Sequence, residues 1–134
     1  MRTLLNVIWL VFSGFWLAVS YAVLGVLMCL LVVTIPFGIA LFRLAGFVIW
    51  PFGRTVVPRP GAGPASTVGN VIWFVVAGVW IAIAHLSTAI ALCLTIIGIP
   101  MAIPNLRLAV VALTPLGKEV VRADDPRAVG ATVW

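Results

Sequence analysis

The chain has 134 residues, of which 64% are hydrophobic and only 8% are charged. A soluble domain carries about 25% charged residues, so this composition excludes an ordinary water-soluble fold. The net charge of +5 is not arranged as a basic run interleaved with aromatic residues, which argues against nucleic-acid binding. The composition therefore indicates an integral membrane protein, with the lipid bilayer as its partner.

The predicted elements begin with a long apolar helix over about residues 4–33, which contain no charged residue. We expect an uncleaved first membrane span, because this run is too long for a signal peptide. The helix breaks at residues 34–38, around Pro36 and Gly38, since proline removes a backbone donor and glycine tolerates a turn. A shorter apolar helix follows over about residues 39–50.

A linker rich in proline and glycine occupies residues 58–67 and predicts an extended, solvated connection. The same order of elements then returns. A second long helix is predicted over 68–97, a break around Pro100 over 98–101, and a second short helix over 103–114.

An internal repeat explains this return. A shift of 64 positions aligns residues 6–57 with residues 70–121 without a gap, and about 20 of the 52 pairs are identical. Such a repeat fixes the architecture. The sequence therefore predicts an all-α membrane fold of two tandem helical hairpins with about four spans. The expected divisions are repeat 1 over 1–57, the linker over 58–67, repeat 2 over 68–122 and a poorly ordered polar tail over 123–134.

The short helices leave two membrane arrangements open. About 16 residues extend roughly 24 Å, less than the roughly 30 Å hydrocarbon core, so each forms either a thin span or a re-entrant segment. We favour spans, because the breaks carry no charge while the linker and both ends are basic. Both termini and the linker are then expected in the cytoplasm. The flanking basic residues are Arg2, Arg54, Arg59, Lys118, Arg122 and Arg127.

One stripe of each long helix combines polar, small and aromatic residues. Steps of three and four residues place them on one helix face, and Gly14 lies alongside, which allows close helix approach. The stripe indicates helix packing or, alternatively, a pore lining. Its members are Asn6, Trp9, Ser13 and Trp16 in repeat 1, and Asn70, Trp73 and Trp80 in repeat 2.

Arg43 and Arg107 each lie seven residues after a break proline, inside the short helices. Residues 1–118 contain no Asp or Glu, so an ion pair within the spans is excluded. One interpretation is structural, with the arginines reaching headgroups or capping freed carbonyls. The other is an anion pathway, since charges at depth usually face a cavity. The breaks themselves are either plain turns or ion sites of broken helices.

The remaining candidates receive structural interpretations. His85, which replaces Tyr21 of repeat 1, is expected to form hydrogen bonds between helices. Cys29 and Cys93 are expected to be small packing residues. The sequence has no acid pair, no nucleophile with a base, no phosphate loop and no metal-ligand spacing, so it predicts neither an enzyme nor a cofactor.

Taken together, the motifs resemble the YccF-like family of bacterial inner-membrane proteins. They are the N-V-I-W start, the following G-x-W, the I-P-F-G break with its later arginine, and the W-P-F-G-R close. The resemblance covers residues 3–121, and copy two is looser, with Met101, Ala102 and Thr114 where copy one has Phe37, Gly38 and Trp50. It implies an inner-membrane location and no established activity.

Two functions remain as hypotheses. The first is an oligomeric channel or transporter component for small anions, with Arg43 and Arg107 as the positive field. The alternative is a structural or accessory membrane subunit that binds partner helices without permeation. Four helices are too few to enclose a pore, so we expect a homo-oligomer.

Overall fold

The computed structural model describes residues 1–129; residues 130–134, the end of the predicted polar tail, lie outside the described part. The helices and strands are α1 (Arg2–Trp9), α2 (Phe15–Leu30), α3 (Ile35–Ile49), β1 (Arg54–Pro58), α4 (Pro64–Trp73), α5 (Val79–Cys93), α6 (Gly98–Leu113) and β2 (Lys118–Arg122).

Each repeat forms one helical hairpin, which confirms the predicted all-α membrane fold. A π-helical turn joins α1 to α2, and another joins α4 to α5, so each pair makes one long helix. α2 packs along α3, and α5 packs along α6. Three helices, Arg2–Leu30, Val32–Ile49 and Pro64–Cys93, are long and apolar enough to cross a membrane, whereas Gly98–Leu113 is shorter.

The turns of the hairpins lie before the prolines that were predicted to break the chain. They occupy residues 31–34 and 94–97, and Pro36 lies in the first turn of α3. Pro100 has the equivalent place in α6. Proline is favoured there because a first-turn N–H has no helical partner. Gly38 lies within α3, where a Cβ would stand 2.8 Å from the Gly25 carbonyl of α2.

The π-helical turns divide the predicted stripe. In the turn Leu10–Gly14 the Phe15 N–H donates to the carbonyl of residue 10, five positions earlier. The added residue rotates everything after it by about 100°. Trp9 lies before this turn and is fully buried, whereas Trp16 lies after it and is 66% exposed; Trp80 is 69% exposed in repeat 2. The second tryptophan of each stripe therefore lies on the outer surface of this chain.

A two-stranded antiparallel sheet joins the repeats, and the sequence analysis did not predict it. β1 and β2 pair with Val56 opposite Val120, which are equivalent residues of the two repeats. The repeats are therefore related by an approximate twofold axis through this pair. β1 ends at Pro58 and α4 begins at Pro64, so residues 59–63 connect the strand to the second repeat.

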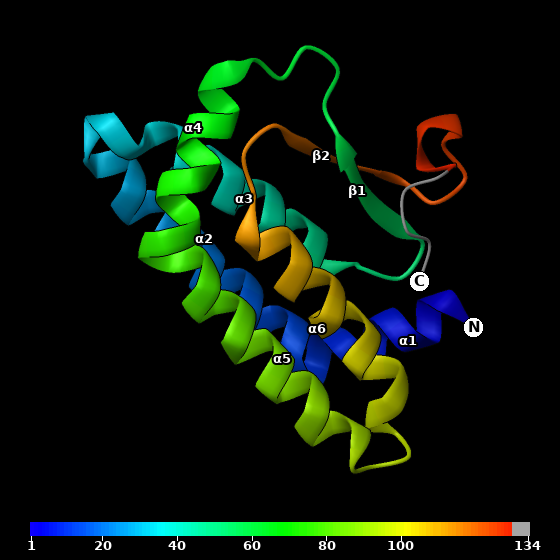
Figure 1. The fold of residues 1–134 in the computed structure, drawn as a ribbon. Helices are drawn as coiled ribbons and strands as arrows, with labels where there is room; N and C mark the ends of the chain where they lie inside the picture. The colour runs from blue at the N-terminus through cyan, green and yellow to red at the C-terminus, as the bar shows by residue number, and fades with distance from the viewer. Residues whose placement is uncertain (130–134) are drawn as a thin grey trace.

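Figure 1 shows the two hairpin turns at opposite ends of the molecule, with the sheet beside its middle. Contacts between the repeats agree with hairpins that point in opposite directions. Phe37, just after the first turn, stacks on Trp73 at the end of α4 in the other repeat, with ring centres 5.2 Å apart. Side chains of both hairpins form one apolar core, which includes Trp9, Phe47 and Leu108.

Candidate functional site

The asparagine of each N-V-I-W segment holds the turn that ends the short helix. The Asn6 amide donates to the Phe52 carbonyl and accepts from the Phe52 N–H, both at 2.9 Å. Asn70 makes the same two bonds with Leu116, at 3.1 and 2.9 Å. A carboxamide has both a donor and an acceptor, so it satisfies both polar groups of one residue. These asparagines therefore tie the start of each long helix to the turn that follows the short helix.

The tryptophan three residues later binds the last turn of the short helix. Trp9 Nε1 donates to the Val48 carbonyl at 2.6 Å, and Trp73 Nε1 donates to the Ala112 carbonyl at 2.8 Å. The last carbonyls of a helix have no partner within it. The two indoles supply these partners, so they belong to the packed core.

Arg43 and Arg107 lie between the short helices and the sheet. Arg43 Nη1 donates to the Lys118 carbonyl, and Arg107 Nη1 donates to the Arg54 carbonyl, both at 3.2 Å. Lys118 and Arg54 occupy equivalent positions of the two repeats. Each arginine therefore binds the strand of the opposite repeat, rather than the carbonyls freed by the turns.

These two carbonyls lie on the free edges of the sheet. The Ala123 N–H donates to the Gly53 carbonyl at 2.9 Å, so the odd-numbered residues of β1 form the inner ladder. The Arg54 and Lys118 carbonyls consequently point outward. An unpaired sheet edge attracts other chains, and each guanidinium occupies part of one edge. Arg43 thus joins its helix to the sheet and covers an edge at once.

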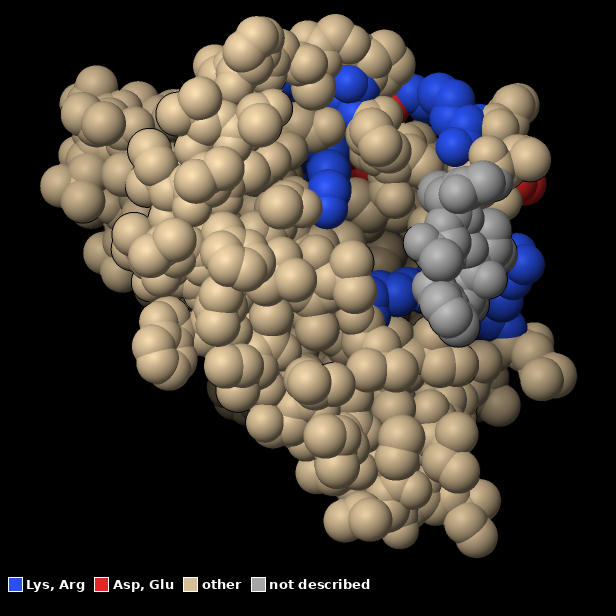
Figure 2. Space-filling model, in the orientation of Figure 1, with Lys and Arg blue, Asp and Glu red and all other residues tan. Residues whose placement is uncertain are grey.

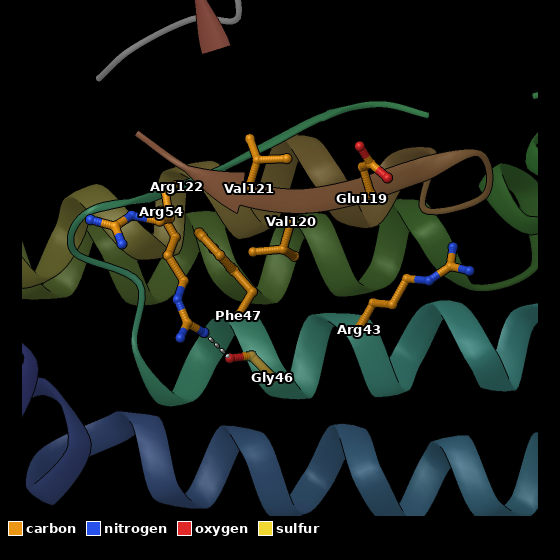
Figure 3. A pocket seen from close by; sticks show the side chains of 8 residues that line it. All are labelled: Arg43, Gly46, Phe47, Arg54, Glu119, Val120, Val121 and Arg122. Atoms are coloured by element: carbon orange, nitrogen blue, oxygen red, sulfur yellow. Dashed lines mark hydrogen bonds between the residues drawn. The ribbon is translucent and has the colours of Figure 1, made fainter. Parts of the chain in front are cut away.

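A hollow of about 510 Å³ separates α3 from β2, as Figure 3 shows. Arg54 and Arg122 lie at one end of it and Arg43 at the other, with Phe47 and Val120 between them. The Arg54 guanidinium donates to the Gly46 carbonyl at 3.4 Å. The hollow thus has two arginines at one end, Arg43 together with the carboxylate of Glu119 at the other, and an apolar middle. Its lining residues are Arg43, Gly46, Phe47, Arg54, Glu119, Val120, Val121 and Arg122.

The charged residues gather around the sheet. On the face shown in Figure 2, Lys and Arg lie over the sheet and near the N-terminus, while the hairpin surfaces to the left and below carry none. Acidic groups occur only beyond residue 118. Hydrogen bonds from Arg127 hold the pKa of Asp125 below its usual range, and burial lowers the pKa of Lys118. The sheet is therefore a predominantly basic platform.

A chain of three polar side chains lies between the hairpins, which confirms the prediction for His85. Tyr21 Oη lies 2.6 Å from His85 Nε2, and His85 Nδ1 lies 3.0 Å from Asn105 Oδ1. The Asn105 amide donates to the Met101 carbonyl at 3.3 Å, which leaves its oxygen as acceptor. We therefore assign a proton to His85 Nδ1, so that Nε2 accepts from the tyrosine. The network fixes the contact between repeats.

The sheet, which binds both arginines, is the structural element that the sequence did not predict. Its signal was available in the residues that follow each Pro-x-Gly turn. Arg54-Thr55-Val56-Val57 and the equivalent Lys118-Glu119-Val120-Val121 are short segments rich in β-branched residues. A glycine turn followed by such a segment indicates a strand, but these segments are short beside the long apolar helices of the repeats.

The comparisons with known proteins agree with this architecture. The model of the YccF family, described as the inner membrane component domain, matches residues 4–54 and again residues 68–118. Over 55 residues the chain is 44% identical to inner membrane protein YccF of Escherichia coli (strain K12) and to inner membrane protein YccF of Shigella flexneri. The aligned part covers 41% of this chain and 37% of each relative. No solved structure matches the chain. The chain is therefore an inner membrane protein of the YccF family, with two copies of the family's domain.

Proposed function

We propose that the chain is a structural or accessory subunit of the inner membrane, which binds partner helices and conducts no ions. The observation that carries this proposal is the use of Arg43 and Arg107. Both guanidinium groups bind strand carbonyls of the opposite repeat. Charged side chains that select ions form rings along a pore, whereas these two hold a sheet in place. The proposal assigns no catalytic step to the chain.

The interior between the hairpins also supports this role. Tyr21, His85 and Asn105 bond to one another there, and apolar side chains of both hairpins pack around them. A conducting path needs a continuous polar lining whose groups bind the passing ion weakly enough to release it. In the described residues this region is occupied by mutually satisfied groups.

We propose that the partner helices include those of a second copy, which contact the outer faces at Trp16 and Trp80. Both side chains are largely exposed, and neither indole N–H has a hydrogen bond within residues 1–129. A tryptophan N–H away from water favours a partner, and tryptophans frequently dominate binding energies. The approximate twofold symmetry presents this face twice.

The oligomer is tested by replacing both tryptophans with alanine. We expect the Trp16→Ala, Trp80→Ala variant to shift toward monomer in native mass spectrometry from mild detergent. The matched control is Val11→Ala with Val75→Ala, an equivalent exposed pair, which should keep the parent distribution. A double-tryptophan variant that assembles like the parent would exclude these faces as the contact.

We propose that the basic platform, the termini and the linker face the cytoplasm. Basic residues beside membrane segments mark that side, and the sheet and its flanks carry most of them. A reporter inserted at Ala62 should read as cytoplasmic. A periplasmic signal there would reverse this orientation.

The second candidate is an oligomeric channel or transporter component for small anions. The hollow beside Arg43, Arg54 and Arg122 supports it, because three guanidinium groups face one solvent-accessible space. Such a cluster attracts anions through its summed field. In this candidate, several copies would bring their hollows together around a path.

Anion flux through liposomes separates the two candidates. Under the structural proposal, the parent protein gives no flux above empty liposomes, and Arg43→Gln with Arg107→Gln lowers the unfolding midpoint. Under the channel candidate, the parent conducts anions and the double variant loses flux while its unfolding midpoint stays unchanged. Flux by the parent with this loss would overturn the structural proposal.

A further inference from the structure

We infer that both hairpins enter the bilayer from the sheet side and end near its midplane, so that the chain occupies one leaflet. The apolar partner of the hairpin turns is then the hydrocarbon of that leaflet. This inference goes beyond the proposed function and does not depend on it.

The sheet lies beside the middle of the hairpins rather than beyond their ends. Arg43, in the middle of α3, donates to the carbonyl of Lys118 in β2. Arg54, at the start of β1, donates to the carbonyl of Gly46. Figure 3 accordingly shows β2 alongside α3 rather than beyond its end. The platform therefore lies beside the middle of the short helix.

The charges of the sheet fix its depth. Lys118, Glu119 and Arg122 belong to β2, and burying such groups in hydrocarbon is costly. The sheet therefore lies at the headgroups or in water. Arg43 is tied to the sheet by its hydrogen bond, so it marks the same level on α3.

The length of helix beyond this level decides how far the hairpins reach. Arg43 lies eight residues after Ile35, the first residue of α3, which is about 12 Å of helix. Arg107 lies nine residues after Gly98, the first residue of α6, which is about 14 Å. One leaflet contributes about 15 Å of the roughly 30 Å hydrocarbon core. Even helices perpendicular to the membrane would thus end near the midplane.

The long helices fit the same geometry. Arg2 lies beside Gly53 at the end of the sheet, where a Cβ on the glycine would stand 3.5 Å from the arginine Cδ. The helix from Arg2 to Leu30 therefore starts near the level of the sheet and ends at the turn. Its 29 residues extend about 43 Å, so a descent of one leaflet requires a strong tilt. The divergent turns of Figure 1 agree with such tilted hairpins.

The turns are built for an environment without water. Val33 is 90% exposed and Ile96 is 89% exposed, so aliphatic groups form their surface. Backbone groups in hydrocarbon must find partners within the protein. The Thr34 hydroxyl donates to the Leu31 carbonyl at 2.8 Å, and the Thr95 hydroxyl accepts from the Gly98 N–H at 3.0 Å. The Thr34 hydroxyl also lies 2.6 Å from the Met28 carbonyl, so the turn threonines add hydrogen bonds to backbone groups where the long helices end.

Thiol labelling in intact membranes tests the inference. In a Cys29→Ala, Cys93→Ala background, Val33→Cys and Ile96→Cys place one thiol at either turn, and Ala62→Cys is the linker control. A membrane-impermeant maleimide is applied to spheroplasts and to inverted vesicles, and labelling in SDS defines full reaction at each site. We expect the control cysteine to react from one side only and the turn cysteines to react from neither side. The extent of labelling at the turns should be about tenfold lower than in SDS, because hydrocarbon excludes the reagent.

Reaction of the turns from the side opposite to the control would overturn the inference and establish hairpins that cross. Reaction from the same side as the control would also overturn it, because the turns would then lie at the surface. Ion conduction plays no part in this readout, so failure here is distinct from failure of the proposed function.

Depth is measured with bimane attached to the same cysteines in liposomes. Lipids with a quencher at carbon 12 of the acyl chain should quench both turns more strongly than lipids with the quencher at carbon 5. Stronger quenching by the shallow probe would place the turns near a headgroup region and overturn the inference.

Discussion

Replacing Gly14 with alanine should destabilise the first hairpin, because the indole of Trp9 lies against this glycine. A Cβ at Gly14 would stand 2.6 Å from Trp9 Nε1 and 3.0 Å from the Val48 carbonyl. The indole must then move and lose its hydrogen bond to Val48. In the same helix arrangement, Gly46 of α3 has no heavy atom within 4 Å of an added Cβ, which makes Gly46→Ala the matched control.

The magnitudes give opposite signs for the two variants. Gly14→Ala loses a hydrogen bond worth about 1 kcal/mol and overpacks the contact at a cost of about 1–3 kcal/mol. Alanine recovers about 0.5–1 kcal/mol of helix propensity, so we expect a net loss of about 2 kcal/mol. Gly46→Ala retains only the propensity term and should gain about 0.5–1 kcal/mol.

Unfolding in mixed micelles of SDS and dodecyl maltoside, followed by tryptophan fluorescence and far-ultraviolet circular dichroism, measures both changes. Gly14→Ala should unfold at a lower SDS fraction than the parent, and Gly46→Ala at an equal or higher one. If Gly14→Ala is as stable as Gly46→Ala, the close contact between Trp9 and Gly14 does not exist, and the account of the π-helical turn is refuted.

Three further changes test individual hydrogen bonds in the same unfolding assay. Asn6→Ala should cost about 1–3 kcal/mol, because both polar groups of Phe52 lose their buried partner; an unchanged midpoint would exclude a structural role for this amide. Tyr21→Phe should cost about 1 kcal/mol, since His85 Nε2 loses its donor, and full stability would mean that water replaces the hydroxyl. Thr34→Val should cost about 1 kcal/mol in lipid bilayers and less in detergent, where water reaches the turn; equal losses would show a turn that is already hydrated.

The helical part of the fold could be predicted because its signals are local. Two long charge-free runs, each followed by a segment that contains proline and glycine, define two hairpins without any knowledge of tertiary contacts. The internal repeat then establishes that the two hairpins are equivalent. The exact turns were displaced by a few residues, since Pro36 and Pro100 favour the start of a helix as readily as the end of one.

The sheet could not be predicted with the same ease because its pairing is not local. β1 and β2 are short strands that follow the short helices of different repeats, so a whole hairpin separates them in the chain. Their antiparallel register depends on the twofold relation of the two hairpins, which no sequence pattern expresses. Arg43 and Arg107 bind carbonyls of the sheet. Without the sheet, the sequence could not distinguish a structural role of these arginines from an anion site.

The outward position of Trp16 had another cause. In a regular α-helix, the heptad spacing would place Trp16 on the same face as Trp9. The π-helical turn between them rotates Trp16 onto a different face. The sequence contains Gly14 at this point, and glycine there allows the Trp9 indole to cross the helix. Only the three-dimensional contact shows that the glycine serves the indole.

An antiparallel sheet joins the two repeats across their equivalent residues, with the arginines bound to its edges. A disulfide between Val56→Cys and Val120→Cys tests it most directly in a background without Cys29 and Cys93. These residues face each other in a pair without mutual backbone hydrogen bonds, where Cα atoms lie about 4.5 Å apart, within the range that a disulfide spans. Mild oxidation of membranes should give an intramolecular disulfide, seen as a reducible mobility shift of the monomer. A reduced monomer, or cross-linking only between chains, would contradict the account.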